Sequence, residues 1–408
     1  MYNMKRNFIY LLLFIVLCGC KEEFIGQYPV DKVAPGVVTN VSVENIPGGA
    51  RISYTLPEEK DLLCVKARYT LTNGQEMEQS GSAYVNRITL KGFGKGAKTK
   101  IELVTIDKSH NESKVVSVDI EPLDSPIYGI MESLKYYASF GGLKLLWENA
   151  EKEDIVFGLL TKDEEGAYKE TSTIYSSTAN VNTSARGYEA KEIAFGFYIR
   201  DTYNNHTDTI YDVLTPYFET ELDKSKFRVL PLPTGVAYRD PATNAMPLLW
   251  NGRSNVLYET FYIKLGEVDP FFSFDMGVTA KLSRFRLWQR MDLLFQFYNP
   301  RYFEIWGTND ESKVGDPDNW DGWFKIMNCE SKRPSGLGVP TSDADLTQED
   351  IDYALAGEEY EIPIDAPAFR YFRMYVYNPY NPLIGGTWGG SKALHLEEIT
   401  IWGAPENE

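Results

Sequence analysis

Apolar and polar residues alternate with a period of two over most of the chain from residue 37 onward, and turn-forming residues separate the alternating segments. This pattern predicts antiparallel strands that each bury one face. One helix is predicted over 347–355, with Thr347 as its N-cap and acidic residues in its first turn. In the last third of the chain the predicted strands are 271–277, 281–288, 301–307, 371–376 and 398–403. The sequence therefore predicts an all-β protein.

Composition narrows the classes of function. The chain has 408 residues, a formal charge of -17 and 14% aromatic residues. Binding to the phosphates of nucleic acid needs a basic patch, so this charge argues against a nucleic-acid partner. The aromatic content argues against a disordered chain. Beyond the first 20 residues only Cys64 and Cys329 remain, which are too few for a disulfide scaffold, and we expect both to be buried thiols.

The amino terminus has the features of a targeting signal. Two basic residues precede an apolar run over 8–17, which is shorter than the roughly 20 residues of a membrane-spanning helix. Leu17-Cys18-Gly19-Cys20 resembles the lipobox of bacterial lipoproteins, which implies a lipid on Cys20. Lys21-Glu22-Glu23 resembles the tag that sends lipoproteins of Bacteroidetes to the outer cell surface. The alternative is an ordinary signal peptide that contains cysteines.

Two segments of the chain repeat the same turn and strand chemistry. Residues 46–54 align with 139–147, and 101–111 align with 194–205 at nearly the same offset. A period near 95 fits a duplicated β-sandwich domain. Both units resemble the fibronectin type III sandwich, because an early strand carries an aromatic residue. These residues are Tyr54 and Trp147, and we expect both to pack between the sheets.

The composition of the chain changes near residue 231, and from there on aromatic residues and arginines are more frequent. Six motifs follow in order: Leu249-Trp250-Asn251-Gly252, Phe274-Asp275-Met276-Gly277, Phe285-Arg286-Leu287-Trp288, Tyr302-Phe303-Glu304-Ile305-Trp306-Gly307, Arg370-Tyr371-Phe372-Arg373 and Glu398-Ile399-Thr400-Ile401-Trp402-Gly403. They resemble a discoidin domain of the coagulation factor 5/8 C-terminal type. That family is a galactose-binding-like jelly-roll β-sandwich and includes the family 32 carbohydrate-binding modules.

The predicted domain boundaries follow from these patterns. They are a lipoprotein signal peptide over 1–19, a lipidated linker over 20–35, fibronectin-like sandwiches over 36–122 and 123–218, a linker over 219–230, and the discoidin-like domain over 231–408. This arrangement resembles the surface glycan-binding lipoproteins of Bacteroidetes polysaccharide-utilisation (Sus-like) systems. The resemblance implies a non-catalytic outer-membrane lipoprotein that faces the cell exterior and captures polysaccharide for uptake. Its implied partners are a TonB-dependent transporter and a SusD-like protein.

Three other functions remain open. The discoidin fold also serves adhesins that bind protein or host matrix, and a flat apolar loop tip would favour that class. A purely structural partner of an outer-membrane transporter would bury the same loops in a complex. A glycoside hydrolase is less favoured, because acidic residues in so acidic a chain carry no information about a catalytic pair.

Sugar binding needs a flat aromatic face for the apolar side of a pyranose ring and fixed polar groups for its hydroxyls. The discoidin resemblance places the ligand loops after Trp288, before Arg301 and after Val376. The glycan-binding residues that it implies are Arg290, Tyr298, Arg301, Asn378, Tyr380 and Trp388. The alternatives are that Trp388 is a loop residue that caps the barrel and that the arginines pair with surplus carboxylates.

Many domains of this type hold a structural calcium ion, and the positions that match its ligands are Asn251, Ser254 and Glu398. Asp is usual where Asn251 stands, so this chain should bind the ion more weakly.

The sequence contains no convincing catalytic motif. The glycine-rich segment 92–97 matches the sequence pattern of a dinucleotide-binding loop, but a strand is predicted after it where that loop requires a helix. The three histidines have no zinc-type spacing.

Overall fold

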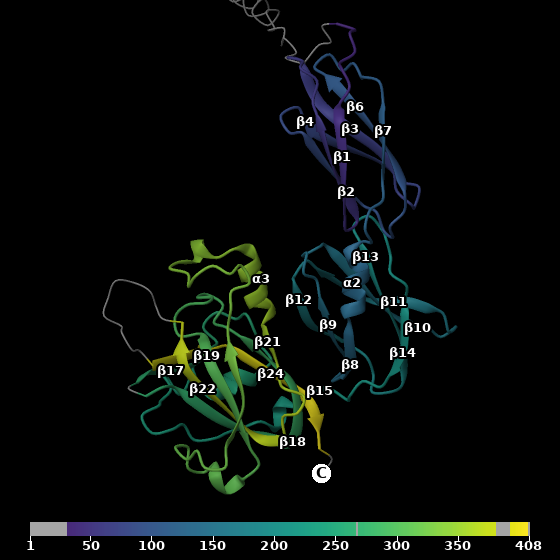
Figure 1. Ribbon diagram of the computed structural model, residues 1–408. Coiled ribbons are helices and arrows are strands. Elements are labelled where there is room, and N and C mark those ends of the chain that lie inside the picture. The colour runs from purple at the N-terminus through teal and green to yellow at the C-terminus, as the bar shows by residue number, and fades with distance from the viewer. Residues whose placement is uncertain (1–30, 267, 381–391, 407–408) are drawn as a thin grey trace, which may run out of the picture.

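The computed structural model describes residues 31–266, 268–380 and 392–406. Figure 1 shows that these residues are built from antiparallel β-sheets, which confirms the all-β prediction. Within the described ranges, no helix is both long and apolar enough to cross a membrane. The predicted lipidation site, Cys20, lies outside them.

The first sandwich packs a three-stranded sheet of order β1-β2-β5 against a four-stranded sheet of order β4-β3-β6-β7. Tyr54 lies between these sheets and is 4% exposed, as predicted. The strands are β1 (Thr39–Ile46), β2 (Gly49–Thr55), β3 (Leu62–Thr70), β4 (Glu76–Ser82), β5 (Arg87–Lys91), β6 (Thr99–Asp107) and β7 (Val116–Ile120).

The second sandwich repeats this topology strand for strand, with sheets of order β8-β9-β12 and β11-β10-β13-β14. The duplication and the fibronectin type III-like fold are therefore confirmed. Trp147 is buried and stacks on Phe157, with ring centroids 4.9 Å apart and planes within 5°. The strands are β8 (Lys135–Ser139), β9 (Gly142–Glu148), β10 (Ile155–Lys162), β11 (Tyr168–Ser176), β12 (Asn180–Arg186), β13 (Ile193–Asp201) and β14 (Ile210–Leu214).

A helix that the sequence did not predict, α2 (Pro126–Ser133), follows the proline-rich segment between the two sandwiches. Pro126 stands in its first turn, where the missing N–H costs no hydrogen bond. Ile127, Ile130 and Met131 enter the core of the second sandwich, so the helix belongs to that domain.

The same side-chain turn closes both sandwiches. Asn111 Nδ2 donates to Asp107 Oδ2 at 2.9 Å, and Asn205 Nδ2 donates to Asp201 Oδ2 at 2.8 Å. The backbone N–H of each asparagine also donates to Oδ1 of the same aspartate, at 2.8 and 2.9 Å. The aspartate after each late strand, which marked the repeat in the sequence, therefore fixes an Asx-type turn.

The asparagine of each turn also donates to a part of the chain that comes before its own sandwich. Asn205 Nδ2 donates to the carbonyl oxygen of Gly92 at 3.0 Å, which joins the second sandwich to the first. A Cβ atom at Gly92 would lie 2.9 Å from the Tyr203 ring, so the glycine-rich segment 92–97 permits close domain contact. Asn111 Nδ2 likewise donates to Asp31 Oδ1 at 3.1 Å and to the Val33 carbonyl at 3.2 Å.

The C-terminal domain is a β-sandwich of one large and one small sheet, in line with the predicted discoidin-like fold. The large sheet has eight strands, with main order β15-β24-β18-β22-β19-β20 and with β16 and β21 paired to β18. The small sheet pairs β17 with β23. The strands are β15 (Thr220–Glu221), β16 (Arg228–Val229), β17 (Phe261–Gly266), β18 (Phe271–Trp288), β19 (Pro300–Thr308), β20 (Phe324–Glu330), β21 (Glu358–Glu361), β22 (Phe369–Pro379), β23 (Lys392–Leu396) and β24 (Glu398–Pro405).

Several local predictions for this domain are confirmed, and one differs. Helix α3 (Gln348–Ala356) begins after Thr347, whose hydroxyl accepts from the Asp350 N–H in a capping box. The two strands predicted over 271–277 and 281–288 are one 18-residue strand, β18, in which Gly277 has φ 73°. Short single-turn 3-10 helices lie in the loops: η1 (Lys224–Lys226), η2 (Met246–Trp250), η3 (Glu311–Lys313) and η4 (Asp343–Asp345).

The segment predicted as a linker, 219–230, belongs to the C-terminal domain. Strands β15 and β16 pair with β24 and β18, and Leu222 and Phe227 are buried in the same core as those strands. Charged residues lie between these two apolar residues, so the sequence of this segment shows no strand pattern. Cys64 and Cys329 are free thiols, as predicted, but only Cys329 is buried.

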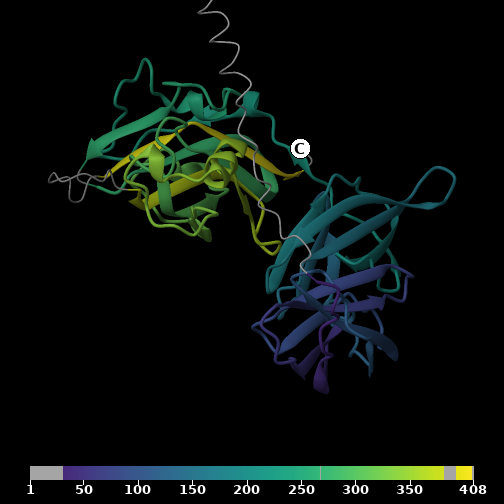
Figure 2. The same ribbon diagram turned by 90° about the horizontal axis from the view of Figure 1, so that it is seen from above.

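The two fibronectin-like sandwiches are stacked end to end, and the C-terminal domain lies beside the far end of the second one (Figure 1). Viewed along the stack, the C-terminal domain is displaced to one side of it (Figure 2). An interdomain ion cluster joins the second sandwich to the C-terminal domain, and its members are Lys144, Arg186, Glu219, Arg284, Glu359 and Glu361.

Candidate functional site

The loop between β18 and β19, residues 289–299, lies where the sequence placed a ligand loop. Phe295, Phe297 and Tyr298 have φ values of 55°, 41° and 67°, a backbone region that residues other than glycine rarely adopt. The buried side chain of Asn299 holds this conformation, because it donates to the Leu293 carbonyl at 2.7 Å and accepts from the Arg290 N–H at 2.9 Å. Backbone strain of this kind is often concentrated at functional sites.

Two of the predicted sugar-binding aromatics have packing roles. Tyr298 is 6% exposed and Tyr380 is 3% exposed, so neither ring offers a face to a ligand. The Tyr380 hydroxyl donates to the Ser331 carbonyl at 2.7 Å, and its ring packs edge-on against Phe295. Tyr380 and Phe295 form a small second core with Leu294 and with Ala354 of α3, whereas the Tyr298 ring stacks against His395.

Arg290 is paired within its own loop. Its guanidinium donates to both carboxylate oxygens of Asp292, at 2.5 and 2.7 Å. Its Nη1 also lies 3.5 Å from Nδ1 of His395, whose ring packs at a tilt against that of Tyr262. Burial, followed by the charge of Arg290, lowers the pKa of His395 to about 3, so the imidazole is neutral. The contacts of Arg290 therefore agree better with the alternative prediction, in which it pairs with a carboxylate, than with direct binding of a ligand.

Arg301 lies at a cavity of about 210 Å³ beside the loop end of the domain. The cavity is lined by Arg301, Glu330, Ser331, Lys332, Arg333, Gly336, Leu337, Gly338, Val339 and Tyr380. In the part of the chain that the structure describes, no carboxylate pairs with the Arg301 guanidinium, which lies 5.0 Å from the Tyr302 ring and 5.5 Å from the Tyr380 ring. Arg301 is therefore free to donate to a ligand at the cavity mouth.

A buried ion pair builds the wall of this cavity. Arg333 and Asp350 have side chains that are 4% and 0% exposed, and Arg333 Nη2 donates to Asp350 Oδ2 at 2.7 Å. The same carboxylate accepts from Ser335 and from the N–H of Thr347. Burial alone would raise the pKa of Asp350, but these hydrogen bonds outweigh it and hold the pKa well below its ordinary value. The pair thereby ties the cavity loop to α3.

The remaining predicted sugar-binding residues have different outcomes. Asn378 is exposed near the end of β22, opposite Tyr302 of β19. Trp388 lies outside the described residues, between Tyr380 and Lys392. The residues that sequence reasoning missed are the cavity wall residues Ser331 to Val339, which follow β20 and match none of the quoted motifs.

Two of the three positions predicted for calcium, Asn251 and Glu398, already have partners within the chain. Glu398 is buried, and Lys224 Nζ donates to its Oε1 at 2.5 Å and to Thr400 Oγ1 at 2.7 Å. Asn251 Oδ1 accepts from the N–H of Arg253, so it faces its own loop. Calcium takes six to eight oxygen ligands, and the described residues hold no group of three or more His, Cys, Asp or Glu suited to a metal. Lys224 supplies a cation for Glu398 Oε1, whereas Glu398 Oε2 is buried without a hydrogen-bond partner among the described residues, so the calcium site stays a prediction.

We expect Lys224→Met to destabilise the C-terminal domain at pH 8 by about 3 kcal/mol, because Glu398 would then be a buried charge without a partner. Burial raises the pKa of Glu398 to about 7 despite Lys224, so this carboxyl is largely protonated at pH 5 and the loss should shrink there. Chemical denaturation at both pH values measures this, with the exposed Lys226→Met as control. If Lys224 is the only cation at Glu398, calcium or a chelator should leave the melting temperature of the wild type unchanged, whereas a clear upward shift with calcium would support the calcium site.

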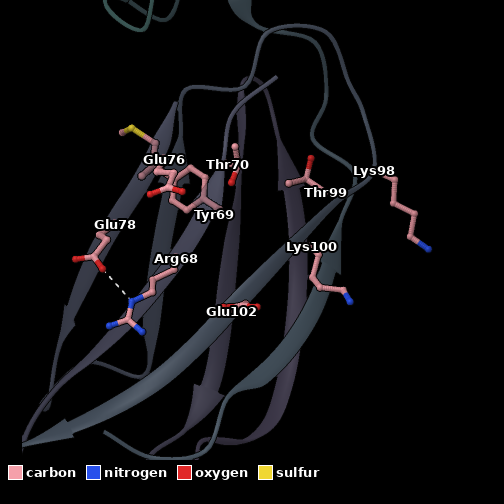
Figure 3. Close-up of a pocket in the computed structure, with 10 residues that line it drawn as sticks. Arg68, Tyr69, Thr70, Glu76, Glu78, Lys98, Thr99, Lys100 and Glu102 are labelled. Atoms are coloured by element: carbon pink, nitrogen blue, oxygen red, sulfur yellow. Dashed lines mark hydrogen bonds and ion pairs between the residues drawn. The ribbon is translucent and has the colours of Figure 1, made fainter. Parts of the chain in front are cut away.

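A larger hollow, of about 580 Å³, lies on the outer face of the first sandwich. It is lined by Arg68, Tyr69, Thr70, Glu76, Met77, Glu78, Lys98, Thr99, Lys100 and Glu102. Figure 3 shows Arg68 and Glu78 paired on one side of the hollow, with Lys98 pointing away from them. Arg68 also pairs with Glu112, and Lys66 pairs with Glu78. This is the usual state of a solvated sheet face rather than of a binding site.

Three family models match successive parts of the chain, and each is described only as a domain of unknown function. They cover residues 35–122, 123–225 and 250–403. No curated protein matches the chain.

Solved structures give resemblances in fold. A SusE-like protein is 28% identical, with 68% of this chain and 98% of that one covered and a TM-score of 0.42. A family 32 carbohydrate-binding module from a family 31 glycoside hydrolase of Clostridium perfringens is 12% identical, with 45% and 94% covered and a TM-score of 0.31. A two-domain fibronectin type III segment of chicken tenascin is 12% identical, with 44% and 99% covered and a TM-score of 0.22. The ligand of this chain must therefore be inferred from its own residues.

Proposed function

We propose that this chain is a non-catalytic lipoprotein, anchored through Cys20 on the outside of the outer membrane, that binds carbohydrate through its C-terminal domain. In this proposal the two fibronectin-like sandwiches are spacers that hold the binding domain away from the membrane. The captured polysaccharide would pass to a TonB-dependent transporter and a SusD-like protein. The lipobox-like and discoidin-like sequence motifs support these assignments.

The observation that carries the proposal is the Arg301 cavity. The Arg301 guanidinium lines it and pairs with no carboxylate among the described residues. Glu330 and Lys332, which pair with each other, and Ser331 supply further donors and acceptors for hydroxyl groups. Leu337, which is 57% exposed, supplies apolar surface beside them. A few fixed polar groups next to apolar surface are what a small sugar-binding site requires. Segment 381–391, which contains Trp388, follows Tyr380 in the sequence and lies outside the described residues.

The test uses residues 21–408, produced without the lipid, in affinity electrophoresis through soluble xylans, galactomannans, pectins, β-glucans and glycosaminoglycans. We expect retardation by one polysaccharide class and, in Arg301→Ala, affinity weakened about tenfold or more through the loss of a charge-assisted hydrogen bond. Trp388→Ala tests the adjoining segment. Arg87→Ala, an exposed arginine of the first sandwich, is the matched control.

Two results would reject the proposal. If a folded wild-type chain is not retarded by any of these glycans, a protein partner becomes the favoured ligand. If it is retarded and Arg301→Ala binds as tightly as Arg87→Ala, the carbohydrate site lies elsewhere than the cavity.

A further inference from the structure

Among the described residues, the outer face of the large sheet in the C-terminal domain is covered over only part of its length. Along β22, Phe372, Met374 and Val376 point into the core, so the residues between them face outward. The loop 309–323 covers one part of this outward face, where Arg373 is 1% exposed. Tyr377, four residues further along the same strand, is 43% exposed. The cover therefore ends between these two positions.

Arg373 holds the covering loop in place. Its guanidinium donates to the carbonyl oxygens of Pro317 and Asn319, at 3.1 and 3.0 Å. It also lies 3.9 Å from the ring of Trp323 and 4.5 Å from that of Trp320. These contacts fix the edge of the cover, so the uncovered strip beyond it is a feature of the fold.

Three tyrosines line the uncovered strip, and we call Tyr302, Tyr375 and Tyr377 the tyrosine row. The Tyr302 and Tyr377 ring centroids are 6.3 Å apart with planes at 28°, and those of Tyr377 and Tyr375 are 6.1 Å apart at 29°. Trp320 closes the end of the row edge-on to Tyr375, at 5.8 Å and 85°. The rings are thus nearly parallel, and they run from the covering loop toward Arg301, which lies 5.0 Å from Tyr302.

Charged side chains border two rings of the row, Tyr375 and Tyr302. The Tyr375 hydroxyl donates to Asp269 at 2.8 Å, and Asp269 pairs with Lys392. Glu304 stands opposite Tyr375 in the β19–β22 register, and Glu330 stands opposite Tyr302 in the β19–β20 register. The centre of a protein–protein interface is depleted of such charges. Aromatic rings interleaved with carboxylates and ammonium groups suit a hydroxyl-rich ligand with apolar ring faces.

We propose that the tyrosine row is a second carbohydrate platform, on which consecutive pyranose rings of one polysaccharide chain stack. This inference rests on the proposed carbohydrate function, but it does not depend on the Arg301 cavity as the primary site. Because Arg301 lies at one end of the row, a chain held at the cavity continues over the tyrosines. The domain then recognises the interior of a polymer, and its affinity rises with the number of sugar units.

The test titrates the polysaccharide that retards the wild-type chain, and short and long oligosaccharides cut from it, by isothermal calorimetry. We expect the wild type to bind the long oligosaccharide about tenfold more tightly than the short one. Tyr377→Ala should lose this length dependence and keep the affinity for the short oligosaccharide. Tyr377→Phe, which retains the ring, should keep both. Tyr175→Ala, an exposed tyrosine of the second sandwich, is the matched control.

The outcomes separate the two proposals. Length dependence that survives in Tyr377→Ala and in the double variant with Tyr302→Ala overturns the tyrosine row alone. A folded wild type that binds none of the polysaccharides overturns the proposed function, and the tyrosine row with it. Tyr377 is exposed at the strand end, so an unchanged melting temperature should show that its replacement leaves the fold intact.

Discussion

Asp350→Ala is expected to destabilise the C-terminal domain by about 3–5 kcal/mol, because Arg333 would become a buried charge without its partner. The substitution also removes the acceptor for Ser335 and for the N–H of Thr347, the residue that caps α3. Denaturation followed by tryptophan fluorescence measures the effect in this domain, since seven of the eight tryptophans lie between Trp250 and Trp402. Glycan binding at the Arg301 cavity should be lost together with the cavity wall.

The pH dependence of this effect has a definite sign. The folded-state pKa of Asp350 is well below the roughly 3.9 of an unfolded aspartate, so its contribution is complete above that pH and declines as the pH falls further. The difference between the wild type and Asp350→Ala should therefore be largest near neutral pH and shrink in acid. Asp352→Ala, an exposed position on the same helix, should change stability by less than about 0.5 kcal/mol. Equal stability of the two variants would show that the buried pair does not hold the cavity wall.

The sequence predicted those features that depend on local pattern. The period-two alternation located the strands, Thr347 located the start of α3, and the repeated Gly-Gly and Asp signals located the duplication. Each of these depends on residues close together in the chain. The sheet pairing of 219–230 could not be predicted in this way, because its anchors Leu222 and Phe227 contact strands that are distant in sequence.

The candidate site shows the same limit. Alternation along β22 assigns Tyr377 to the outward face, but it does not tell which part of that face the loop 309–323 covers. Tyr298 and Tyr380 belong to loops that looked exposed in sequence, yet both are buried: Tyr380 packs in the second core and Tyr298 against His395, which is distant in sequence. Lys224 reaches Glu398 from outside the discoidin-like motifs, so this ion pair could not be predicted without the fold.

Arg186→Ala is expected to loosen the C-terminal domain from the second sandwich. Arg186 Nη2 donates to Glu361 at 2.6 Å, and Nη1 donates to the Phe140 carbonyl at 2.8 Å and lies 3.4 Å from Glu219. Its side chain is 18% exposed, so these contacts are screened less than surface pairs. A charge-assisted hydrogen bond contributes about 1.5–3 kcal/mol, and its loss should raise the population of separated domains about tenfold or more.

Small-angle X-ray scattering of residues 21–408 measures this change, as a larger radius of gyration and a poorer fit to a single arrangement of the domains. Arg51→Ala removes a surface pair with Glu44 inside the first sandwich, and it should scatter as the wild type does. Lys144 also pairs with Glu361 across the same junction. If Arg186→Ala scatters like Arg51→Ala, Arg186 does not set the direction in which the C-terminal domain faces.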